Sequence, residues 1–454
     1  MPYAYYPLSQ LLTDLALRLQ DPNNVFWASA ELTVYIQDAL RTWNAMAAWY
    51  RDRFSFNTTD NVVWYNLSTQ TGTLVPYTVT DTYLFEEIEY HLLEPPTATY
   101  SGSEMFTNQD LVNALQKRRD QFLLETGSVV TQQMVPGAQT NRLQLPDYVI
   151  DVRRMAYLDS TGTYTLMWRS SESEANSFDY GWWTAPGSPS GYSVVEPAPV
   201  VTQMIPTPVL PGSLDLLSIN AGAALNPSVG VVLGVPDDFS WVVKWGALAD
   251  LLTRDGQASD PTRAKYCQQR WIEGVRLAKL STTAITGAID GNNVPINSVF
   301  DMDTAYSGWQ NNTPAPPSIL GLAGMNMLAV ADPPNTAAHS IQLDLLRNMP
   351  VPVLATDLIQ VGREELDVIT DYAEHLAAFK MGGAEFLATL PAYERMVALA
   401  RKQNERWRAF SRFPEDEHDR GRREMKQVKR EVMTEKEHLS AEMEGAVSDG
   451  PRRR

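Results

Sequence analysis

The stretch Val25–Tyr50, VFWASAELTVYIQDALRTWNAMAAWY, decides the fold class of this chain. Its apolar residues recur at steps of three and four, which places them along one side of an α-helix; they are Leu32, Tyr35, Ile36, Ala39, Leu40, Trp43, Ala47 and Tyr50. Ser29 stands where an N-cap accepts a backbone N–H, and Glu31 places negative charge at the positive end of the helix dipole. The pattern therefore predicts a long helix that packs on a core.

Further helical segments surround this stretch. Leucines between Leu8 and Leu19 are followed by the breaker Asp21–Asn24, which predicts a helical hairpin with Val25–Tyr50. Helical spacing returns at residues 81–92 and 107–125. We expect residues 1–127 to form the first part of a helical bundle, with a β-hairpin excursion at residues 61–80, where β-branched and aromatic residues gather.

The period changes from helical to two after Gly127. Four expected strands are separated by Pro-Gly, Pro-Asp and Thr-Gly turns; they cover residues 128–135, 142–145, 149–158 and 164–169. A Pro-, Gly-, Ser- and Trp-rich loop fills residues 170–212, and a strand resumes at Ser213–Ile219. Residues 128–235 are therefore predicted to be an inserted β-rich domain.

Helical periodicity returns at Pro236 and continues through a second helix at Pro261–Leu280. Gly274 would let a neighbouring helix approach closely. We expect residues 236–282 to close the bundle that the N-terminal hairpin begins.

The remaining residues, 283–454, are predicted to be a C-terminal extension. Residues 283–358 have no strong period and are expected to be an irregular arm. Residues 359–413 have helical spacing, and residues 414–454 form a tail rich in both signs of charge. The predicted fold class is α+β, mainly α: a helical bundle with an inserted β-rich domain and an extended, partly helical C-terminal arm.

Composition excludes several classes of function. A formal charge of −17 argues against a sequence-nonspecific DNA-binding protein, which needs a basic surface. One cysteine, Cys267, leaves no internal disulfide and no thiolate metal cluster. The first ten residues lack a signal-peptide pattern, and the longest apolar run, residues 319–331, is too short to span a bilayer, so we expect synthesis in the cytoplasm and no membrane role.

Short Pro- and Gly-containing motifs follow the N-terminal hairpin in a fixed order. Leu145-Pro146-Asp147-Tyr148 comes first and leads to a strand that ends at Gly162. The next motifs, before the last helix pair, are Gly187-Ser188-Pro189-Ser190-Gly191-Tyr192, Ile205-Pro206-Thr207-Pro208 and Val235-Pro236-Asp237-Asp238. This order, over residues 5–282, resembles that of the head-to-tail adaptor proteins of tailed bacteriophages of the podophage type.

The resemblance implies a structural virion protein without enzymatic activity, made in the host cytoplasm and located at the neck of the virion. Such proteins form a homo-oligomeric, typically 12-fold, ring that joins the portal protein to tail nozzle or tail fibre proteins. It also implies that genomic double-stranded DNA passes through the ring without specific binding, and that a C-terminal arm reaches along the portal. No cofactor, metal site or catalytic residue is expected.

Candidate partner-binding residues lie in two places. The rings of Trp182, Trp183 and Tyr192, in the Pro/Gly/Trp-rich loop, suit packing between subunits. Trp168, at the end of the preceding strand, belongs to the same Trp-rich segment. The tail ends in Arg452, Arg453 and Arg454, which could meet acidic portal side chains or DNA phosphates. Both partners for these arginines stay open.

Three further functions remain open from the sequence. One is a tail nozzle or tube component, which should be dominated by β-structure. Another is a tail-associated cell-wall glycosidase that uses Glu86 and Glu89, although we expect the acidic cluster Glu86, Glu87 and Glu89 to be a solvated helix face. The third is a glycan-binding fibre adaptor that uses Trp182 and Trp183.

Overall fold

The computed structural model describes the chain at residues 5–47, 50–69, 77–92, 106–137, 141–178, 181–197, 199–254, 259–281, 284–306, 308–335, 339–347 and 349–411. It has 43% helix and 27% strand in an α+β fold. The prediction of a mainly helical protein is therefore wrong, because five sheets carry a large share of the chain. The chain divides into residues 1–400, described next, and residues 401–454.

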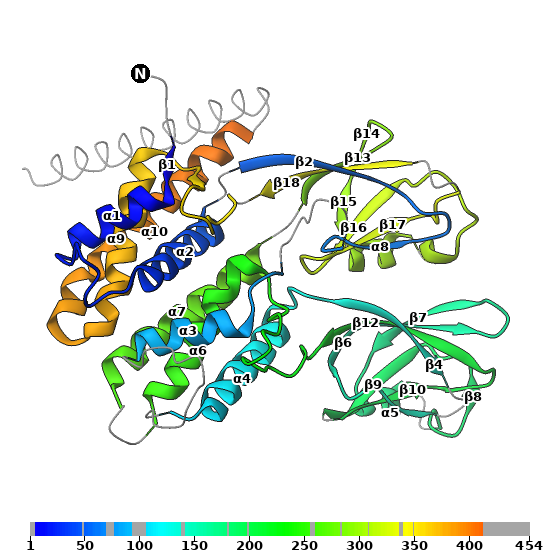
Figure 1. Ribbon diagram of the computed structural model, residues 1–454. Coiled ribbons are helices and arrows are strands. Elements are labelled where there is room, and N and C mark those ends of the chain that lie inside the picture. Colours follow the sequence, from blue (N-terminus) through cyan, green and yellow to red (C-terminus); the bar gives the residue numbers. More distant parts are fainter. Residues whose placement is uncertain are drawn as a thin grey trace, which may run out of the picture. The chain divides into compact units, whose positions relative to one another are not determined.

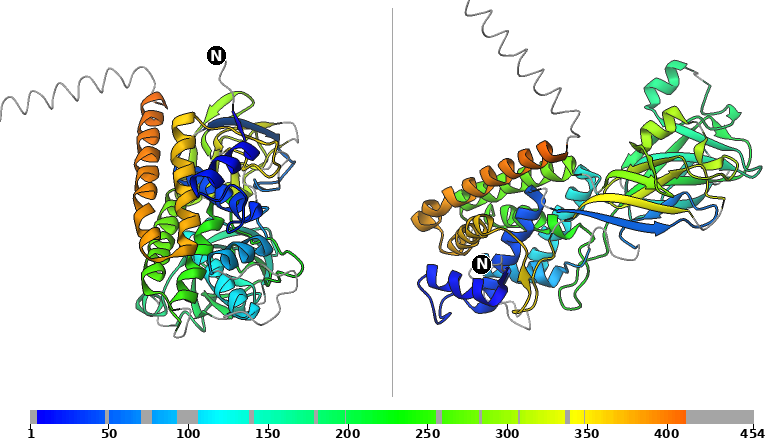
Figure 2. Two further views of the ribbon diagram at one scale, coloured as in Figure 1. Left: turned by 60° about the vertical axis from the view of Figure 1, so that its left-hand side comes forward. Right: turned by 90° about the horizontal axis from the view of Figure 1, so that it is seen from above.

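The helices of residues 1–400 gather at one end of this unit and the sheets at the other (Figures 1 and 2). The long helices share one apolar core; they are α1 (Leu8–Arg18), α2 (Ser29–Met46), α3 (Asp81–His91), α4 (Asn108–Thr126), α6 (Ser240–Leu252), α7 (Pro261–Leu280), α9 (Arg363–Met381) and the part of α10 (Gly383–Ser411) up to Ala400. A 3-10 turn, η1 (Asp237–Phe239), leads into α6. Helices that precede and follow the inserted sheet thus pack against each other.

Helix α2 lies in the middle of this core and buries twelve of its eighteen residues. It begins at Ser29, so the N-cap position belongs to Ala28 and Ser29 provides no side-chain cap. The preceding loop is instead ordered by the carboxylate of Asp21, which accepts the backbone N–H groups of Val25, Phe26 and Trp27 at 2.7–3.0 Å. These hydrogen bonds hold the pKa of Asp21 below its ordinary value.

Helices α6 and α7 approach closely through glycine. A Cβ atom on Gly274 would overlap the side chain of Val242, and one on Gly246 would overlap the ring of Trp271. Without these side chains, the two helix backbones come near enough for Trp241 and Trp245 to be fully buried beside them.

A curled seven-stranded sheet is inserted between α4 and α6, in the order β4-β12-β6-β7-β9-β10-β5. Its strands are β4 (Thr131–Gly137), β5 (Arg142–Gln144), β6 (Val149–Asp159), β7 (Tyr164–Arg169), β9 (Gly191–Pro197), β10 (Val200–Ile205) and β12 (Gly212–Asn220). The β7–β9 pair is parallel and the other neighbours are antiparallel. The loop expected at residues 170–212 also contains α5 (Glu172–Phe178) and the short parallel pair β8 (Pro186–Gly187) and β11 (Thr207–Pro208).

The segment that we expected to be an irregular arm contributes six strands to two four-stranded sheets. One has the order β14-β13-β18-β2 and the other β15-β16-β17-β3; the strands are β2 (Tyr50–Asn57), β3 (Trp64–Asn66), β13 (Ala284–Ile289), β14 (Asn292–Val294), β15 (Ile296–Ser298), β16 (Ile319–Ala323), β17 (Met327–Ala331) and β18 (Ser340–Arg347). Their apolar side chains form one core, so the sheets pack face to face. The segment also contains α8 (Val299–Ala305) and η2 (Trp309–Asn311).

The expectation of an irregular arm failed because these strands are only three to eight residues long and their partners are distant. Strand β18 pairs with β2 over eight residues, from Ser340↔Asn57 to Arg347↔Tyr50, and β17 pairs with β3. The chain then returns to the helices through β19 (Leu358–Ile359), which pairs with β1 (Tyr6–Pro7) at the start of α1.

Candidate functional site

The three aromatic residues predicted for partner binding lie in different environments. Trp182 is 4% exposed, and its Nε1 donates to Asn176 Oδ1 at 3.0 Å. Tyr192 is 1% exposed in β9, and burial raises its pKa to about 12. Trp183 is 57% exposed, so of these three rings it is the one that can meet a partner without a change in conformation.

A further exposed aromatic ring belongs to Trp168 in β7, which is 65% exposed. Its backbone N–H donates to Ser190 O at 2.9 Å, which ties it to the start of β9. The neighbouring Met167 is buried, so the period of two along β7 places Trp168 on the outward face. The predicted residues Arg452, Arg453 and Arg454 lie outside the described residues.

The helical core contains a buried ionic cluster made by α2, α3 and α6. The ammonium group of Lys244 pairs with Asp38 and lies 3.5 Å from Glu87 Oε2, and all three side chains are at most 1% exposed. Burial alone would lower the pKa of Lys244, but the charges of Asp38 and Glu87 outweigh burial and raise it. Burial raises the pKa of Glu87 to about 7, although Lys244 opposes this shift.

The acidic cluster on α3 is therefore not the solvated face that we expected from sequence. Glu87 and Glu89 are 1% and 2% exposed. The apolar spacing of α3 misled the prediction because Lys244, which compensates Glu87, is more than 150 residues away. The cluster joins three helices inside the core, where a substrate has no access.

His91, one turn after Glu87, lies in an aromatic cage. Its ring centroid is 5.3 Å from those of Tyr35 and Trp245 and 5.2 Å from that of Phe379. Burial and the nearby charge of Lys244 hold the pKa of His91 well below its ordinary value. The imidazole is thus neutral at physiological pH and belongs to the packing of the core.

Asp301 and Asp303 are close in sequence and have the carboxylate oxygens that a hard cation prefers, but both side chains make structural hydrogen bonds instead. Asp301 completes a capping box with Ser298 at the start of α8. Asp303 accepts two hydrogen bonds, at 2.6 and 2.8 Å, from the guanidinium of Arg154 in β6. Arg154 is 4% exposed, so this pair joins the seven-stranded sheet to α8. No group of three potential metal-binding side chains occurs in the part of the chain that the structure describes.

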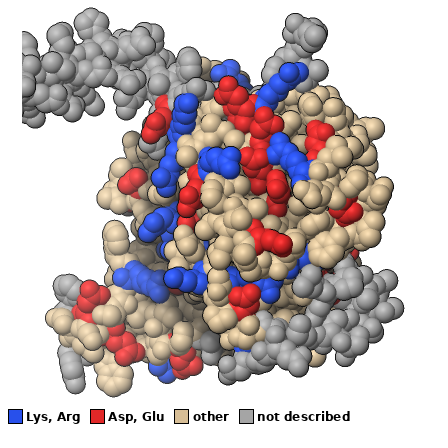
Figure 3. Space-filling model, turned by 90° about the vertical axis from the view of Figure 1, so that its left-hand side faces the viewer, with Lys and Arg blue, Asp and Glu red and all other residues tan. Residues whose placement is uncertain are grey.

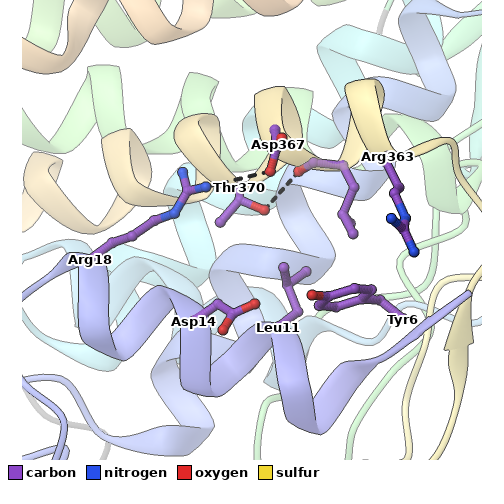
Figure 4. Close-up of a pocket in the computed structure, with 8 residues that line it drawn as sticks. Tyr6, Leu11, Asp14, Arg18, Arg363, Asp367 and Thr370 are labelled. Atoms are coloured by element: carbon purple, nitrogen blue, oxygen red, sulfur yellow. Dashed lines mark hydrogen bonds and ion pairs between the residues drawn. The ribbon is translucent and has the colours of Figure 1, made fainter.

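A shallow groove lies between α1 and α9 on the surface of the helical body (Figure 4). Its cavity has a volume of about 280 Å³. Its lining includes the apolar residues Leu11 and Leu366 and the charged residues Asp14, Arg18, Arg363 and Asp367. In Figure 4, Arg18 reaches from α1 toward Asp367 on α9. A groove with a mixed apolar and charged lining suits a side chain or helix of another protein better than it suits catalysis.

One face of the helical body carries its charges in groups (Figure 3). Lys and Arg side chains form a band along the left and lower part of the described surface in this view, and Asp and Glu side chains lie between and above them. Exposed apolar side chains occur on the same body, including Val25 at 84% and Phe26 at 50% in the loop before α2. Such mixed surfaces are typical of protein–protein contacts.

Comparison with protein-family models finds no match for this chain, and a search among curated proteins finds none either. Among the helices that the structure describes, none has both the length and the apolar character needed to cross a bilayer. The function proposed below accordingly rests on the fold, the exposed side chains and the motif order of this chain.

Proposed function

We propose that this protein is a structural head-to-tail adaptor of a tailed bacteriophage, which forms a homo-oligomeric ring between the portal protein and the tail. The observation that carries the proposal is the shared core of α1, α2, α6 and α7 on the two sides of the inserted sheet. This is the arrangement that the motif order implies, with a helical body and a strand-rich insertion.

We assign different roles to the helices and to the inserted β-rich region of this protein. A helical body with a continuous core deforms little, so it can serve as the ring wall. The inserted β-rich region presents two exposed rings, Trp168 in β7 and Trp183 in the turn before β8. Aromatic rings at exposed positions bind protein surfaces at a small entropic cost. We assign this part of the inserted region to contacts with neighbouring subunits or with tail proteins.

The distribution of charge supports passage of DNA without adhesion. Residues 412–454 contain 11 basic and 11 acidic side chains, so the full formal charge of −17 belongs to residues 1–411. A ring built from bodies of this charge repels phosphates at short range, within a Debye length of about 8 Å at physiological salt. DNA can then move through the channel without releasing counterions to a basic wall.

Electron microscopy of the purified full-length protein, alone and mixed with its portal protein, tests the proposal. We expect closed rings with a central channel, and a complex in which the ring is coaxial with the portal. A protein that stays monomeric under both conditions, up to about 100 μM, would refute the adaptor function. A companion measurement is fluorescence anisotropy with labelled duplex DNA at 150 mM salt, for which we expect a Kd weaker than about 10⁻⁴ M, the weak end of nonspecific binding.

A glycan-binding role is a second candidate because Trp168 and Trp183 are exposed. Retention on a glycan array that is lost in Trp183→Ala and Trp168→Ala would favour it. A tail nozzle and a cell-wall glycosidase have less support. A helix content of 43% does not favour a nozzle or tube dominated by strands, and burial of Glu89 does not favour a glycosidase pair with Glu86.

A further inference from the structure

Helix α7 carries a basic stripe on its exposed face. Lys265, Gln269, Ile272, Arg276 and Lys279 follow one another at steps of four and three residues, so they share one side of the helix. All five are exposed, including Ile272 at 51%. From Lys265 to Lys279 the stripe extends over 14 residues, or about 21 Å of helix.

The three cations of this stripe have no ion-pair partner among the described residues. The carboxylate nearest in sequence, Glu273, is held elsewhere: it accepts from Tyr393 at 2.5 Å and from Arg270 at 3.3 Å. A body with 43 acidic and 26 basic side chains in residues 1–411 offers many acidic groups. The three cations of this helix face are therefore free to pair with carboxylates of another protein.

Helix α9 carries the complementary stripe. Glu364, Asp367, Asp371 and Glu374 recur at steps of three, four and three residues, over about 15 Å of helix. Asp371 is paired with Arg18 at 2.5 Å, whereas Glu364 is exposed and has no ion pair in the described chain.

The groove between α1 and α9 adds to this acidic surface. The side chain of Asp367 is 79% exposed and lies 3.6 Å from Arg18. Asp14 lines the groove and has no ion-pair partner among the described residues, and Arg363 likewise has none. The charged lining of the groove is balanced, because Asp14 and Asp367 equal Arg18 and Arg363 in number. The surface around it is acidic, since Glu364, Asp371 and Glu374 on α9 outnumber the neighbouring Arg395 and bring the total to five carboxylates against three guanidinium groups.

We infer that the α7 stripe of one subunit binds the acidic groove between α1 and α9 of a second copy of the same chain. This inference rests on the proposed ring function and names the surfaces that make the ring. The contact is heterologous, because the two surfaces are different parts of one protein. Two subunits joined in this way together keep one free stripe and one free groove, so further subunits can add until the ring closes.

Affinity and orientation come from different groups in this contact. An exposed ion pair stabilises little, so the opposite charges mainly select the partner and fix its direction. Ile272, half exposed in the monomer, stands in the middle of the basic stripe, and the cavity of about 280 Å³ beside α1 is lined in part by Leu11 and Leu366. Burial of this apolar side chain favours association, and the same burial is repeated at every contact of a ring.

A charge exchange on the full-length protein tests the inference. The stripe variant carries Lys265→Glu, Arg276→Glu and Lys279→Glu. The groove variant carries Asp14→Lys, Glu364→Lys and Asp367→Lys. Light scattering coupled to size exclusion and mass photometry give the subunit number of each variant, of the wild type and of an equimolar mixture of the two variants.

We expect each variant alone to associate at least about a hundredfold more weakly than the wild type, because like charges then face each other. The mixture should regain the wild-type subunit number, since the reversed stripe of one variant meets the reversed groove of the other, and the two unchanged surfaces meet as in the wild type. A control variant with Asp60→Lys, Glu125→Lys and Glu385→Lys reverses three exposed carboxylates that lie outside the α7 stripe, the groove and the seven-stranded sheet. It should assemble as the wild type does.

The outcomes separate the ring function from the contact that builds it. A wild type that never associates overturns the ring function and the contact together. A wild type that forms rings while the stripe variant forms the same rings overturns the contact alone. Monomeric variants that fail to assemble in the mixture overturn the pairing of stripe with groove. Circular dichroism and the thermal midpoint should match the wild type in each variant, because the substituted side chains contribute little to the core.

Discussion

Replacement of Lys244 with methionine should destabilise the helical body strongly. Lys244 is fully buried and stands between Asp38 and Glu87, whose side chains are each 1% exposed. Methionine fills most of the volume of the lysine stem, so the cavity term is small. The dominant effect is electrostatic, because two buried carboxylates lose their cation, and loss of one partner of a buried pair costs about 3–5 kcal/mol.

The pH dependence of this loss identifies its cause. Without Lys244 the pKa of Glu87 rises further above about 7, whereas the unfolded side chain keeps its ordinary value of 4.5. The folded variant then takes up a proton between pH 8 and pH 5.5 that the unfolded chain does not, and stability is regained at about 1.4 kcal/mol per pH unit for that proton. We expect the variant to be much closer to the wild type at pH 5.5 than at pH 8.

Native-state hydrogen exchange with mass spectrometry measures this effect locally, which suits a chain of 454 residues better than a single unfolding transition. Peptides from α2, α3 and α6 should exchange about two to three and a half orders of magnitude faster at pH 8, after correction for the intrinsic rate. A triple variant with Lys244→Met, Asp38→Asn and Glu87→Gln is the matched control and should recover most of the protection. An increase below about fivefold, or an equal increase at both pH values, would contradict the electrostatic explanation.

Three further predictions concern single residues. Glu87→Gln should make the stability of the helical body depend less on pH. The pKa of Glu87 is raised on folding, so its protonated carboxyl stabilises the folded state fully below about pH 4.5, and this stabilisation is lost as the pH rises to about 7. Gly274→Ala should lower the stability of the α6–α7 pair by about 1 kcal/mol, because overlap of the new methyl group with Val242 outweighs the gain in helix propensity. Arg154→Met should cost about 3–5 kcal/mol and accelerate exchange in β6 and α8, because Asp303 is left buried without its guanidinium.

Each of these predictions has its own control. Arg169→Met removes an exposed arginine that lies 3.2 Å from Asp151 in the same sheet region, and its effect should stay below about 1 kcal/mol. The Arg154 prediction fails if both arginine variants have equal thermal midpoints. A stability profile of Glu87→Gln that parallels the wild type between pH 5 and 7 would assign the titration to another group. A raised midpoint for Gly274→Ala would show that α6 and α7 can separate without loss.

Several elements could be predicted because their signals are local. The apolar spacing of residues 25–50 indicated α2, and the alternation at residues 149–158 indicated β6. Strands β9 and β10 were missed because their neighbours in sequence are rich in Pro and Gly, which are typical of loops. Trp182 and Tyr192 could not be distinguished from Trp183 by sequence, because burial depends on what covers each ring.

The sequence by itself determined where the long helices lie, since a helix makes its hydrogen bonds within four residues and repeats its apolar face every 3.6. The seven-residue helices α5 and α8 were not predicted, because so short a segment shows too few repeats of an apolar face. Only the tertiary structure decided that β18 lies beside β2, about 290 residues away, and that Lys244 meets Glu87 in the core. A strand forms hydrogen bonds with a neighbouring strand, and a buried charge pairs with an opposite charge. In both cases the partner can lie anywhere along the chain, so sequence order does not identify it. For the same reason we predicted a helical bundle with one β-rich insertion, whereas the chain also forms two four-stranded sheets outside that insertion.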